Sequence, residues 1–187
     1  TLKLNYINTL IYGNDTVPTD LDFNKVFDYL PSLQVLELFG IKKPTLSLNP
    51  TKIIPSLVCF KLVQCEIGIE KFDKFPNLRK VQIENCEKVE ELHLDDNKHL
   101  QEVILSDLNK LSCLYVGEPG QDIHTIQISN CFTFIRTESF WIQGNIKNFT
   151  LQDCRFKNIL TELIKYFKVE NLEIINTTIP VSILHKL

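Results

Sequence analysis

Long hydrophobic runs are missing from this chain of 187 residues. The longest are only a few residues, such as Ile53-Ile54, whereas a helix that crosses a bilayer needs about 20 consecutive apolar residues. We therefore expect no membrane insertion by this segment. The opening stretch, TLKLNYINTL, also lacks the basic head, apolar centre and small-residue cleavage site of a signal peptide.

Methionine is absent, and the last residues, 183–187, stop in the middle of an apolar pattern. We expect the chain to be a processed or excised piece of a longer protein. Positive charge is not in excess either, because the 20 Lys and Arg residues are outnumbered by 23 Asp and Glu residues. The net charge is −3. This net charge argues against binding to nucleic acid or to acidic membranes through a broad positively charged surface.

Paired cysteine motifs, glycine-rich loops and a nucleophile beside a base are also missing. The six cysteines form no CxxC or CxC pair, which excludes a zinc ribbon or a thioredoxin-type motif, and the six glycines are scattered. We therefore expect no catalytic residues, no cofactor and no enzyme activity. His93 and Asp95 would share one face of a strand and could seat a metal ion, but a solvated polar face is the simpler interpretation, so we predict no metal site.

Apolar residues recur with one rhythm, at steps of three, two and three. It occurs seven times, and successive copies begin 21 to 24 residues apart. The copies are Leu33-Leu36-Leu38-Ile41, Leu57-Phe60-Leu62-Cys65, Leu78-Val81-Ile83-Cys86, Leu100-Val103-Leu105-Leu108, Ile123-Ile126-Ile128-Cys131, Ile146-Phe149-Leu151-Cys154 and Val169-Leu172-Ile174-Thr177. Self-similarity at this period indicates a solenoid, in which each coil packs its apolar residues against the next coil.

The pattern resembles that of the leucine-rich repeat superfamily from about Leu30 to the end of the chain. The resemblance implies an α/β solenoid with a horseshoe shape, one parallel sheet on its concave side, and mixed strand and helix returns on its convex side. We expect a single domain over residues 1–187, with an irregular long first repeat over 1–32 and seven repeats of 21 to 24 residues over 33–187. The fourth-position residues, such as Leu36 and Phe60, should then stack as rungs inside the coil.

The segments between the copies differ in pattern. Two of them, around Val89-Leu92-Leu94 and Leu111-Leu114-Val116, alternate like strands, and we predict return strands there. Residues 155–168 have apolar side chains at helical spacing and predict a helix. Residues 134–144 remain open between the two.

The first 32 residues fit the rhythm less regularly. Leu2 and Leu4 resemble the end of a motif, with Ile7 at its ninth position. The stretch YGNDTVPTDLD predicts a polar loop, since it is rich in Gly, Asn, Asp and Pro. Residues 22–30 then predict a short helix that leads into Leu33.

Four cysteines occupy the ninth position of the motif, which leucine-rich repeats usually fill with an inward-pointing Asn or Cys. These are Cys65, Cys86, Cys131 and Cys154. Since buried Cys behaves as a small hydrophobe with a weak donor, we predict free, packed thiols. Cys59 and Cys113 fall at third positions, one on a principal strand and one on a return strand, so we predict no bond between them.

Three sequons could carry N-linked glycans, at Asn14, Asn148 and Asn176. Asn14 lies in the predicted polar loop, whereas Asn148 and Asn176 fall at third and eighth motif positions, outward on the principal sheet. If the chain is secreted, glycans at these two sites would shield the C-terminal part of that sheet and leave its N-terminal coils for a ligand.

The outward positions of the first three copies are the candidate ligand-binding surface. They comprise Val35, Glu37, Phe39, Cys59, Lys61, Val63, Gln64, Lys80, Gln82 and Glu84. Phe39 is an aromatic of the kind that anchors interfaces, or else it packs against the following loop. Acidic residues between positions 84 and 96 form a negative patch, which is a solvated surface by default and a docking site for a basic partner as the alternative.

The long first repeat running into LPSLQVLEL resembles extracellular arthropod leucine-rich repeat proteins, including Toll-type receptors. This resemblance implies a recognition module of a receptor ectodomain or of a secreted immune or adhesion protein, which binds a protein ligand or co-receptor and can dimerise with itself or another chain. The ninth-position cysteines are instead similar to the repeats of cytoplasmic adaptors and ubiquitin-ligase subunits. The alternative is therefore an intracellular scaffold or substrate-recognition module.

Overall fold

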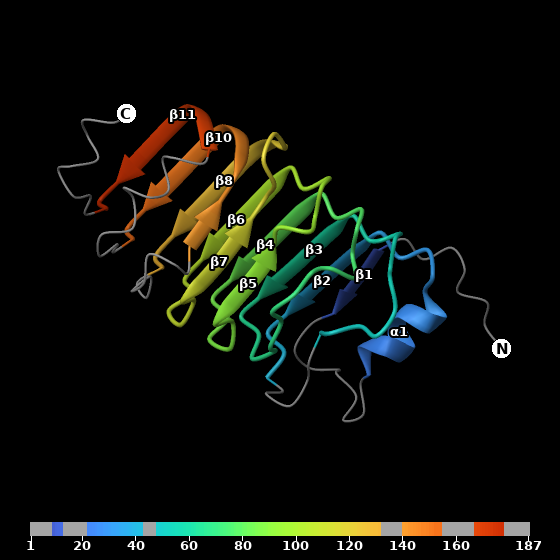
Figure 1. Ribbon diagram of the computed structural model, residues 1–187. Helices are drawn as coiled ribbons and strands as arrows, with labels where there is room; N and C mark the ends of the chain where they lie inside the picture. Colours follow the sequence, from blue (N-terminus) through green and yellow to red (C-terminus); the bar gives the residue numbers. More distant parts are fainter. Residues whose placement is uncertain (1–8, 13–21, 43–47, 132–139, 155–166, 178–187) are drawn as a thin grey trace.

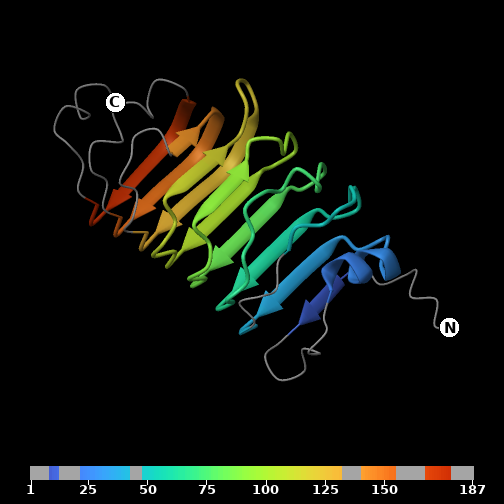
Figure 2. The ribbon, with the colours of Figure 1, turned by 60° about the horizontal axis from the view of Figure 1, so that its bottom comes forward.

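The computed structural model describes residues 9–12, 22–42, 48–131, 140–154 and 167–177. Over these residues the chain forms a parallel β-solenoid. Each coil contributes one strand to a long principal sheet and then returns along a second layer, as Figure 1 and Figure 2 show from two directions. The solenoid predicted from the apolar rhythm is therefore confirmed.

The principal sheet has eight strands in the order β1-β2-β3-β4-β6-β8-β10-β11, and every neighbouring pair is parallel. Its strands are β1 (Thr9–Tyr12), β2 (Val35–Phe39), β3 (Cys59–Val63), β4 (Lys80–Glu84), β6 (Glu102–Ser106), β8 (Asp122–Ser129), β10 (Gly144–Gln152) and β11 (Phe167–Ile175). Successive coils lie side by side in chain order, from blue to red in Figure 1.

The predicted stack of fourth-position residues is confirmed by the strand register. The aligned residues are Leu36, Phe60, Val81, Val103, Ile126, Phe149 and Leu172. The first six are at most 1% exposed. Full burial of such a side chain contributes about 1.5–3 kcal/mol, so the stack supplies a continuous core that no single coil could form.

Leu172 differs from the other rungs because it is 37% exposed. It lies on β11, the last strand of the principal sheet. In the described part of the chain, this rung therefore has a neighbouring coil on one side only. Leu172 therefore keeps the register of the stack but is less enclosed than the other six rungs.

A bulge-like hydrogen-bond pattern explains the first step of three in the rhythm. The carbonyl of Gln34 accepts from two consecutive N–H groups of the next coil, those of Val58 at 2.8 Å and Cys59 at 3.0 Å. The carbonyls of Val58, Arg79 and Gln101 accept two consecutive N–H groups in the same way. One extra residue is thereby inserted before the fourth position, and two side chains in succession face outward.

A left-handed residue explains the second step of three. The eighth motif position has a positive φ in each of the seven motif copies, at Gly40, Gln64, Asn85, Asp107, Asn130, Asp153 and Asn176, with values of 47° to 62°. The N–H of this residue donates across to the next coil, for example from Gly40 to the carbonyl of Val63 at 2.8 Å. The turn brings the ninth residue back to the inside. Asn, Asp and Gly tolerate this conformation better than other residues do.

The ninth-position cysteines form a ladder of weak hydrogen bonds inside this turn. The Sγ of Cys65 accepts from the N–H of Ile41 at 3.4 Å and donates to the carbonyl of Val63 at 3.2 Å. The Sγ of Cys86 accepts from the N–H of Cys65 at 3.4 Å and donates to the carbonyl of Glu84 at 3.1 Å. Each thiol thus supplies an acceptor for the N–H of the ninth residue one coil earlier, and it adds a second donor to a carbonyl that already accepts from the preceding coil.

All six cysteines are free, and the four at ninth positions are buried, which confirms the prediction of packed thiols. Burial raises the pKa of the Cys131 thiol to about 12. In the last coil, Thr177 takes the same role with its hydroxyl, which accepts from the N–H of Cys154 at 3.2 Å and donates to the carbonyl of Ile175 at 2.9 Å.

The second layer contains a three-stranded parallel sheet, which we call the return sheet. Its strands, in order, are β5 (Glu91–Leu94), β7 (Cys113–Val116) and β9 (Phe140–Ile142). The two predicted return strands are confirmed by β5 and β7. For residues 134–144, left open between strand and helix, β9 shows a strand in the part that the structure describes.

Buried aromatic rings join the two layers at the N-terminal end. Phe60 of the principal sheet meets Phe72 of the return layer edge-on, with ring centroids 5.3 Å apart. Phe72 also contacts Phe75, and Phe75 packs against Phe27 at 5.8 Å. The core therefore fills the space between the layers.

The predicted helix over residues 22–30 is confirmed as α1 (Phe23–Tyr29). Asp22 caps it, because its side chain accepts from the N–H of Asn24 at 3.0 Å. Phe23 and Phe27 are its buried residues and face the core. α1 is the only helix in the described residues. In these residues the solenoid is therefore built mainly of β-strands, and the predicted mixture of strand and helix returns is not seen beyond α1.

The helix predicted over residues 155–168 lies outside the described residues except at its end. Phe167 and Lys168 there begin β11, so the prediction is wrong for these two residues. They pair with Gly144 and Asn145 of β10. Pairing with a neighbouring long strand overrides the local helical pattern at this point.

The frame predicted for the first repeat is also wrong. Leu2, Leu4 and Ile7 lie outside the described residues, but the strand that pairs with β2 is β1, and Leu10 takes the register of Leu36. The start of the chain matches the steps of three and two in more than one frame. Pairing with the second coil selects the later frame.

Candidate functional site

The candidate ligand-binding residues of the first three motif copies lie together on the outward face of β2, β3 and β4. We call this surface the strand face. It consists of Val35, Glu37, Phe39, Cys59, Lys61, Val63, Lys80, Gln82 and Glu84, three residues from each strand and all half-buried. Parallel register aligns them in three rows, for example Glu37, Lys61 and Gln82.

Gln64 does not belong to the strand face, although it was predicted there. Its φ of 53° places it in the turn that follows β3, where it is exposed. The motif shows that the eighth residue points out of the coil. It does not show that the backbone has already turned away from the sheet at this residue.

Phe39 is half-buried, and its ring is covered by a charge from the next coil. The Nζ of Lys61 lies 5.5 Å from the ring centroid. Such a cation–π contact contributes about 0.5–1 kcal/mol at an exposed site. The ring is thus held in place on the strand face by its neighbour.

Other polar side chains on and beside the strand face are paired with one another. Lys80 and Glu102 form an ion pair of 3.0 Å, with each side chain 35% exposed. The amide of Gln82 donates to the carboxylate of Glu84. The surface therefore presents a mixed pattern of both signs with apolar residues between them.

The two sequons within the described residues lie near the C-terminal end of the sheet. Asn148 faces outward on β10, where its side chain accepts from Asn171 at 3.0 Å and donates to the carbonyl of His124 at 3.3 Å. Asn176 is exposed at the left-handed position of the last coil. Asn14 lies outside the described residues, and glycosylation stays a prediction at all three.

A groove of about 670 Å³ lies where β8, β10 and β11 begin. These strands have eight or nine residues, whereas the five-residue strands before them begin later in the motif. Its lining carries both signs of charge, including Asp122, Lys147, Lys168 and Glu170. The sequence prediction missed the groove, although Ile123, Ile146 and Val169 of its lining begin motif copies, because the motif does not show where each strand begins.

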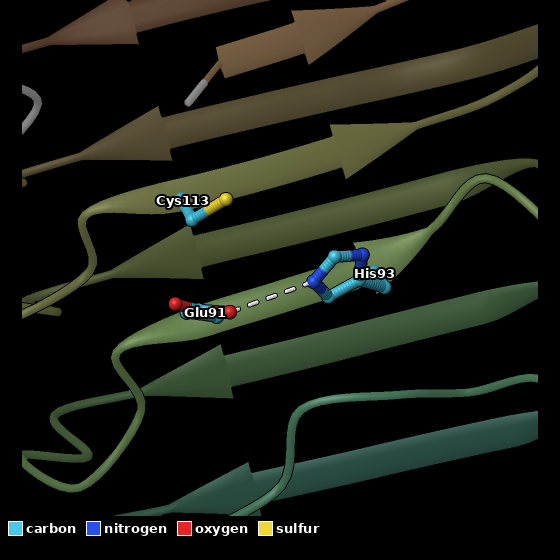
Figure 3. Close-up of side chains that lie close together, drawn as sticks. All are labelled: Glu91, His93 and Cys113. Atoms are coloured by element: carbon cyan, nitrogen blue, oxygen red, sulfur yellow. Dashed lines mark ion pairs between the residues drawn. The ribbon is translucent and has the colours of Figure 1, made fainter. Parts of the chain in front are cut away.

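Three side chains of different chemistry converge on the outward face of the return sheet, as Figure 3 shows. Glu91 and His93 come from β5 and Cys113 from β7, and their ligand atoms all lie within 4.8 Å of one another. The His93 Nε2 is 3.6 Å from a carboxylate oxygen of Glu91. We call these three residues the return-sheet cluster.

Tyr115 borders the return-sheet cluster. Its ring stacks on the imidazole of His93, with centroids 4.7 Å apart and planes at 18°. Burial raises the pKa of the Cys113 thiol, and a side-chain hydrogen bond between Tyr115 and Cys113 raises the pKa of Tyr115. The stacking on Tyr115 sets the ring orientation of His93.

Asp95 was the partner considered for His93 from the sequence, but the ligand atoms that converge with His93 belong to Glu91 and Cys113. The missing signal was the register between return strands. Aligning the two strand-like return patterns places Cys113 beside Glu91, as observed in the β5–β7 pairing.

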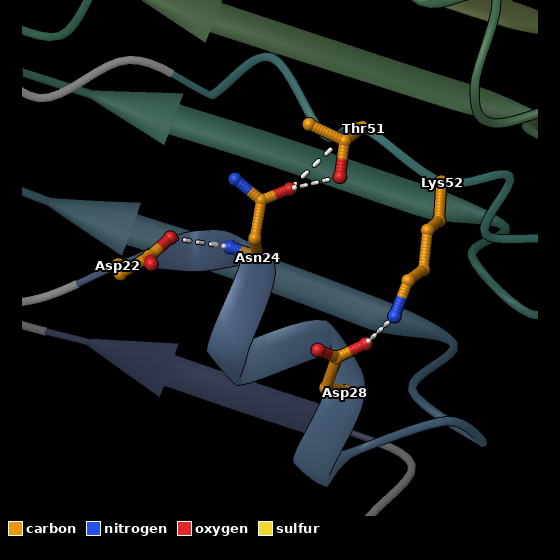
Figure 4. A network of polar contacts seen from close by, with 5 residues as sticks. All are labelled: Asp22, Asn24, Asp28, Thr51 and Lys52. Carbon is orange, nitrogen blue, oxygen red and sulfur yellow. Dashed lines mark hydrogen bonds and ion pairs between the residues drawn. The ribbon is translucent and has the colours of Figure 1, made fainter.

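An exposed polar network fastens α1 to the following coil, as Figure 4 shows. The side-chain oxygen of Asn24 accepts from both the N–H of Thr51 at 2.9 Å and its hydroxyl at 3.3 Å. Lys52 forms an ion pair with Asp28 at 2.7 Å. These contacts tie the helix to its neighbour and have no feature of a ligand site.

Comparisons with protein-family models, with curated proteins and with solved structures find no match for this chain. Within the part that the structure describes, no helix is both long and apolar enough to cross a membrane. Function is therefore inferred from the arrangement of side chains.

Proposed function

We propose that this chain is a protein-recognition module of the leucine-rich repeat type, which binds a protein ligand or co-receptor through the strand face. The observation that carries the proposal is the strand face itself. Nine half-buried side chains from three coils form one aligned surface of apolar, aromatic and oppositely charged residues. Protein interfaces combine these residue types, and a rigid sheet presents them at low entropic cost.

The leucine-rich repeat assignment is supported by three features of the coil. The period of 21 to 24 residues, the inward stack of apolar rungs and the cysteines at the ninth position all fit that superfamily. A helical return within residues 155–166 and a horseshoe curvature belong to the same proposal. The module binds and performs no chemistry.

The recognition function has an extracellular and an intracellular version, and each is favoured by a different feature of the chain. The sequons at the half-buried, outward-facing Asn148 and the exposed Asn176 favour an extracellular receptor or secreted protein, where glycans would cover the C-terminal coils. The second candidate, an intracellular scaffold or substrate-recognition module, is favoured by the six free cysteines, because free thiols persist in reducing compartments.

A charge-reversal pair tests the strand face. Lys61 and Lys80 are replaced together by Glu, and Lys98 and Lys110, which lie outside the strand face, are replaced together by Glu as the matched control. Both variants have the same net charge. Circular dichroism checks that each folds, since exposed ion pairs contribute at most about 1 kcal/mol.

The immobilised chain is exposed separately to secreted and to cytosolic proteins of the source cells, and a captured protein is purified and its affinity remeasured. We expect the strand-face variant to lose about tenfold or more in affinity, and the control to bind like the wild type. The fraction that yields the partner decides between the two compartments. Equal binding by both variants, or loss in the control alone, would refute the strand face as the binding surface.

A further inference from the structure

The return-sheet cluster brings together a carboxylate, an imidazole and a thiol from two successive coils. Glu91 and His93 are two residues apart on β5, so the alternation of a strand places both side chains on its outward face. Cys113 lies directly beside Glu91 because these residues are register partners in the β5–β7 ladder. The cluster therefore follows from the repeat and from the return strands together.

The three ligand atoms lie at distances that a single small ion can span. All fall within 4.8 Å of one another, and the His93 Nε2 is 3.6 Å from the nearer oxygen of Glu91. Around tetrahedral zinc, with bonds of 2.0–2.3 Å, two ligand atoms stand about 3.4 Å apart. Small rotations of the exposed Glu91 and the half-buried Cys113 side chains close the remaining difference.

The imidazole is already oriented for such a role. Its ring stacks on Tyr115 at 4.7 Å and presents Nε2 toward Glu91. A ligand whose rotamer is held by packing costs less entropy to order when the ion binds. Figure 3 shows the three side chains on adjacent strands of the return sheet.

We propose that Glu91, His93 and Cys113 bind one zinc ion, with water as the fourth ligand, and that the ion bridges two successive coils of the return sheet. The donor set selects the metal, since thiolate and imidazole suit zinc while calcium and magnesium take oxygen ligands. On binding, the Sγ–H bond of Cys113 is replaced by an Sγ–Zn bond and the proton passes to water. No redox partner is needed.

The site lies on the return sheet and not on the strand face. It goes beyond the proposed recognition function and does not depend on it. A bridge between β5 and β7 would stabilise the middle of the solenoid, because the ion binds the folded register and the unfolded chain does not present it.

Cobalt is the probe for the ligands, because a cobalt–thiolate bond gives a charge-transfer absorption band and zinc itself is colourless. The full 187-residue chain, fully reduced, is titrated with cobalt and then with zinc. We expect one equivalent of cobalt to give the band and one equivalent of zinc to abolish it. Thermal unfolding should shift to a higher temperature with zinc and not with magnesium.

Variants assign the ligands. Cys113→Ser should remove the band, and His93→Gln and Glu91→Gln should each weaken cobalt binding at least tenfold. Cys59→Ser, which replaces the other partly accessible thiol, and His99→Gln, which replaces an exposed histidine nearby, should bind like the wild type. Both sets change side chains that are not in the core, and circular dichroism confirms their folding.

The absence of a thiolate band at one equivalent of cobalt would overturn the proposal. So would a band that persists in Cys113→Ser, or one that is lost in Cys59→Ser. Full cobalt affinity in both His93→Gln and Glu91→Gln would also overturn it, because a lone thiol would then account for the signal.

Discussion

Gln64 holds a backbone conformation that its side chain disfavours. Its φ is 53°, whereas the same turn position in the other six coils is Gly, Asn or Asp. In this region the Cβ of most L-residues crowds the following carbonyl, which costs about 1–2 kcal/mol, and Asn is one of the few residues that adopts it routinely. We therefore predict that Gln64→Asn raises the free energy of unfolding.

The expected gain in the free energy of unfolding depends on the contacts of residue 64 that Gln64→Asn leaves unchanged. The N–H of Gln64 donates to the carbonyl of Glu84 at 2.9 Å, so the ladder continues to hold the turn. The side chain is exposed, and its shortening opens no cavity in the core. The expected gain is then at most about 1 kcal/mol. For a chain of this length, 1 kcal/mol corresponds to a rise in Tm of about 2–4 °C.

Thermal and urea unfolding followed by circular dichroism measure this gain. The reverse exchange, Asn85→Gln, alters the same position one coil later, where φ is 50°, and should lower Tm by a similar amount. Gln127→Asn on the outward face of β8 is the matched control and should give no gain, because Asn is disfavoured in strands. A loss of stability in Gln64→Asn, or a gain in Asn85→Gln, would refute the conformational explanation.

Two further predictions concern the core. Phe60→Ala should cost about 3–5 kcal/mol, because the ring is fully buried, whereas Leu172→Ala should cost less than half as much, because Leu172 is 37% exposed. Urea unfolding of both variants gives the comparison, and equal losses would contradict the difference in enclosure. The second prediction concerns Cys131, whose pKa of about 12 in the folded chain exceeds the value of about 8.5 for an unfolded thiol. The contribution of the neutral Cys131 thiol to the free energy of unfolding is complete below about pH 8.5 and is lost as the pH rises toward about 12. The free energy of unfolding of the wild type should therefore fall more steeply than that of Cys131→Ala between about pH 8.5 and 10. Parallel pH profiles of the urea midpoint would contradict this expectation.

The stack of rungs could be predicted from the sequence because the apolar rhythm is local and repeats. Each of the seven copies gives the same inward positions, and a coil can bury them only against the next coil. The buried cysteines follow from the same rhythm, since Cys65 and Cys86 stand where Ile41 stands in an earlier copy. Prediction succeeded where seven independent copies agreed.

Prediction failed where a segment has no second copy to fix its frame. The first coil offers more than one frame, and pairing of Leu10 with Leu36 decides between them. Phe167 and Lys168 carry a helical pattern, yet β10 extends far enough to pair with them. Gln64 was placed on the strand face because the motif marks which residues point outward and does not show where the backbone turns.

The candidate sites divide in the same way. The strand face could be predicted residue by residue, since its members alternate with buried positions of the motif. The return-sheet cluster could not, because each of its residues is unremarkable within its own coil. Only the alignment of β5 with β7 places Cys113 next to Glu91.

The sequence by itself determined the coiled architecture, the inward rungs and the free thiols, because burial of a repeated apolar pattern leaves a single solution. The tertiary structure alone decided where the groove lies and which side chains meet in the return-sheet cluster. These features depend on where each principal strand begins and on the register between the return strands. The apolar rhythm reflects the bulge and the left-handed turn of each coil, but it sets neither of these two.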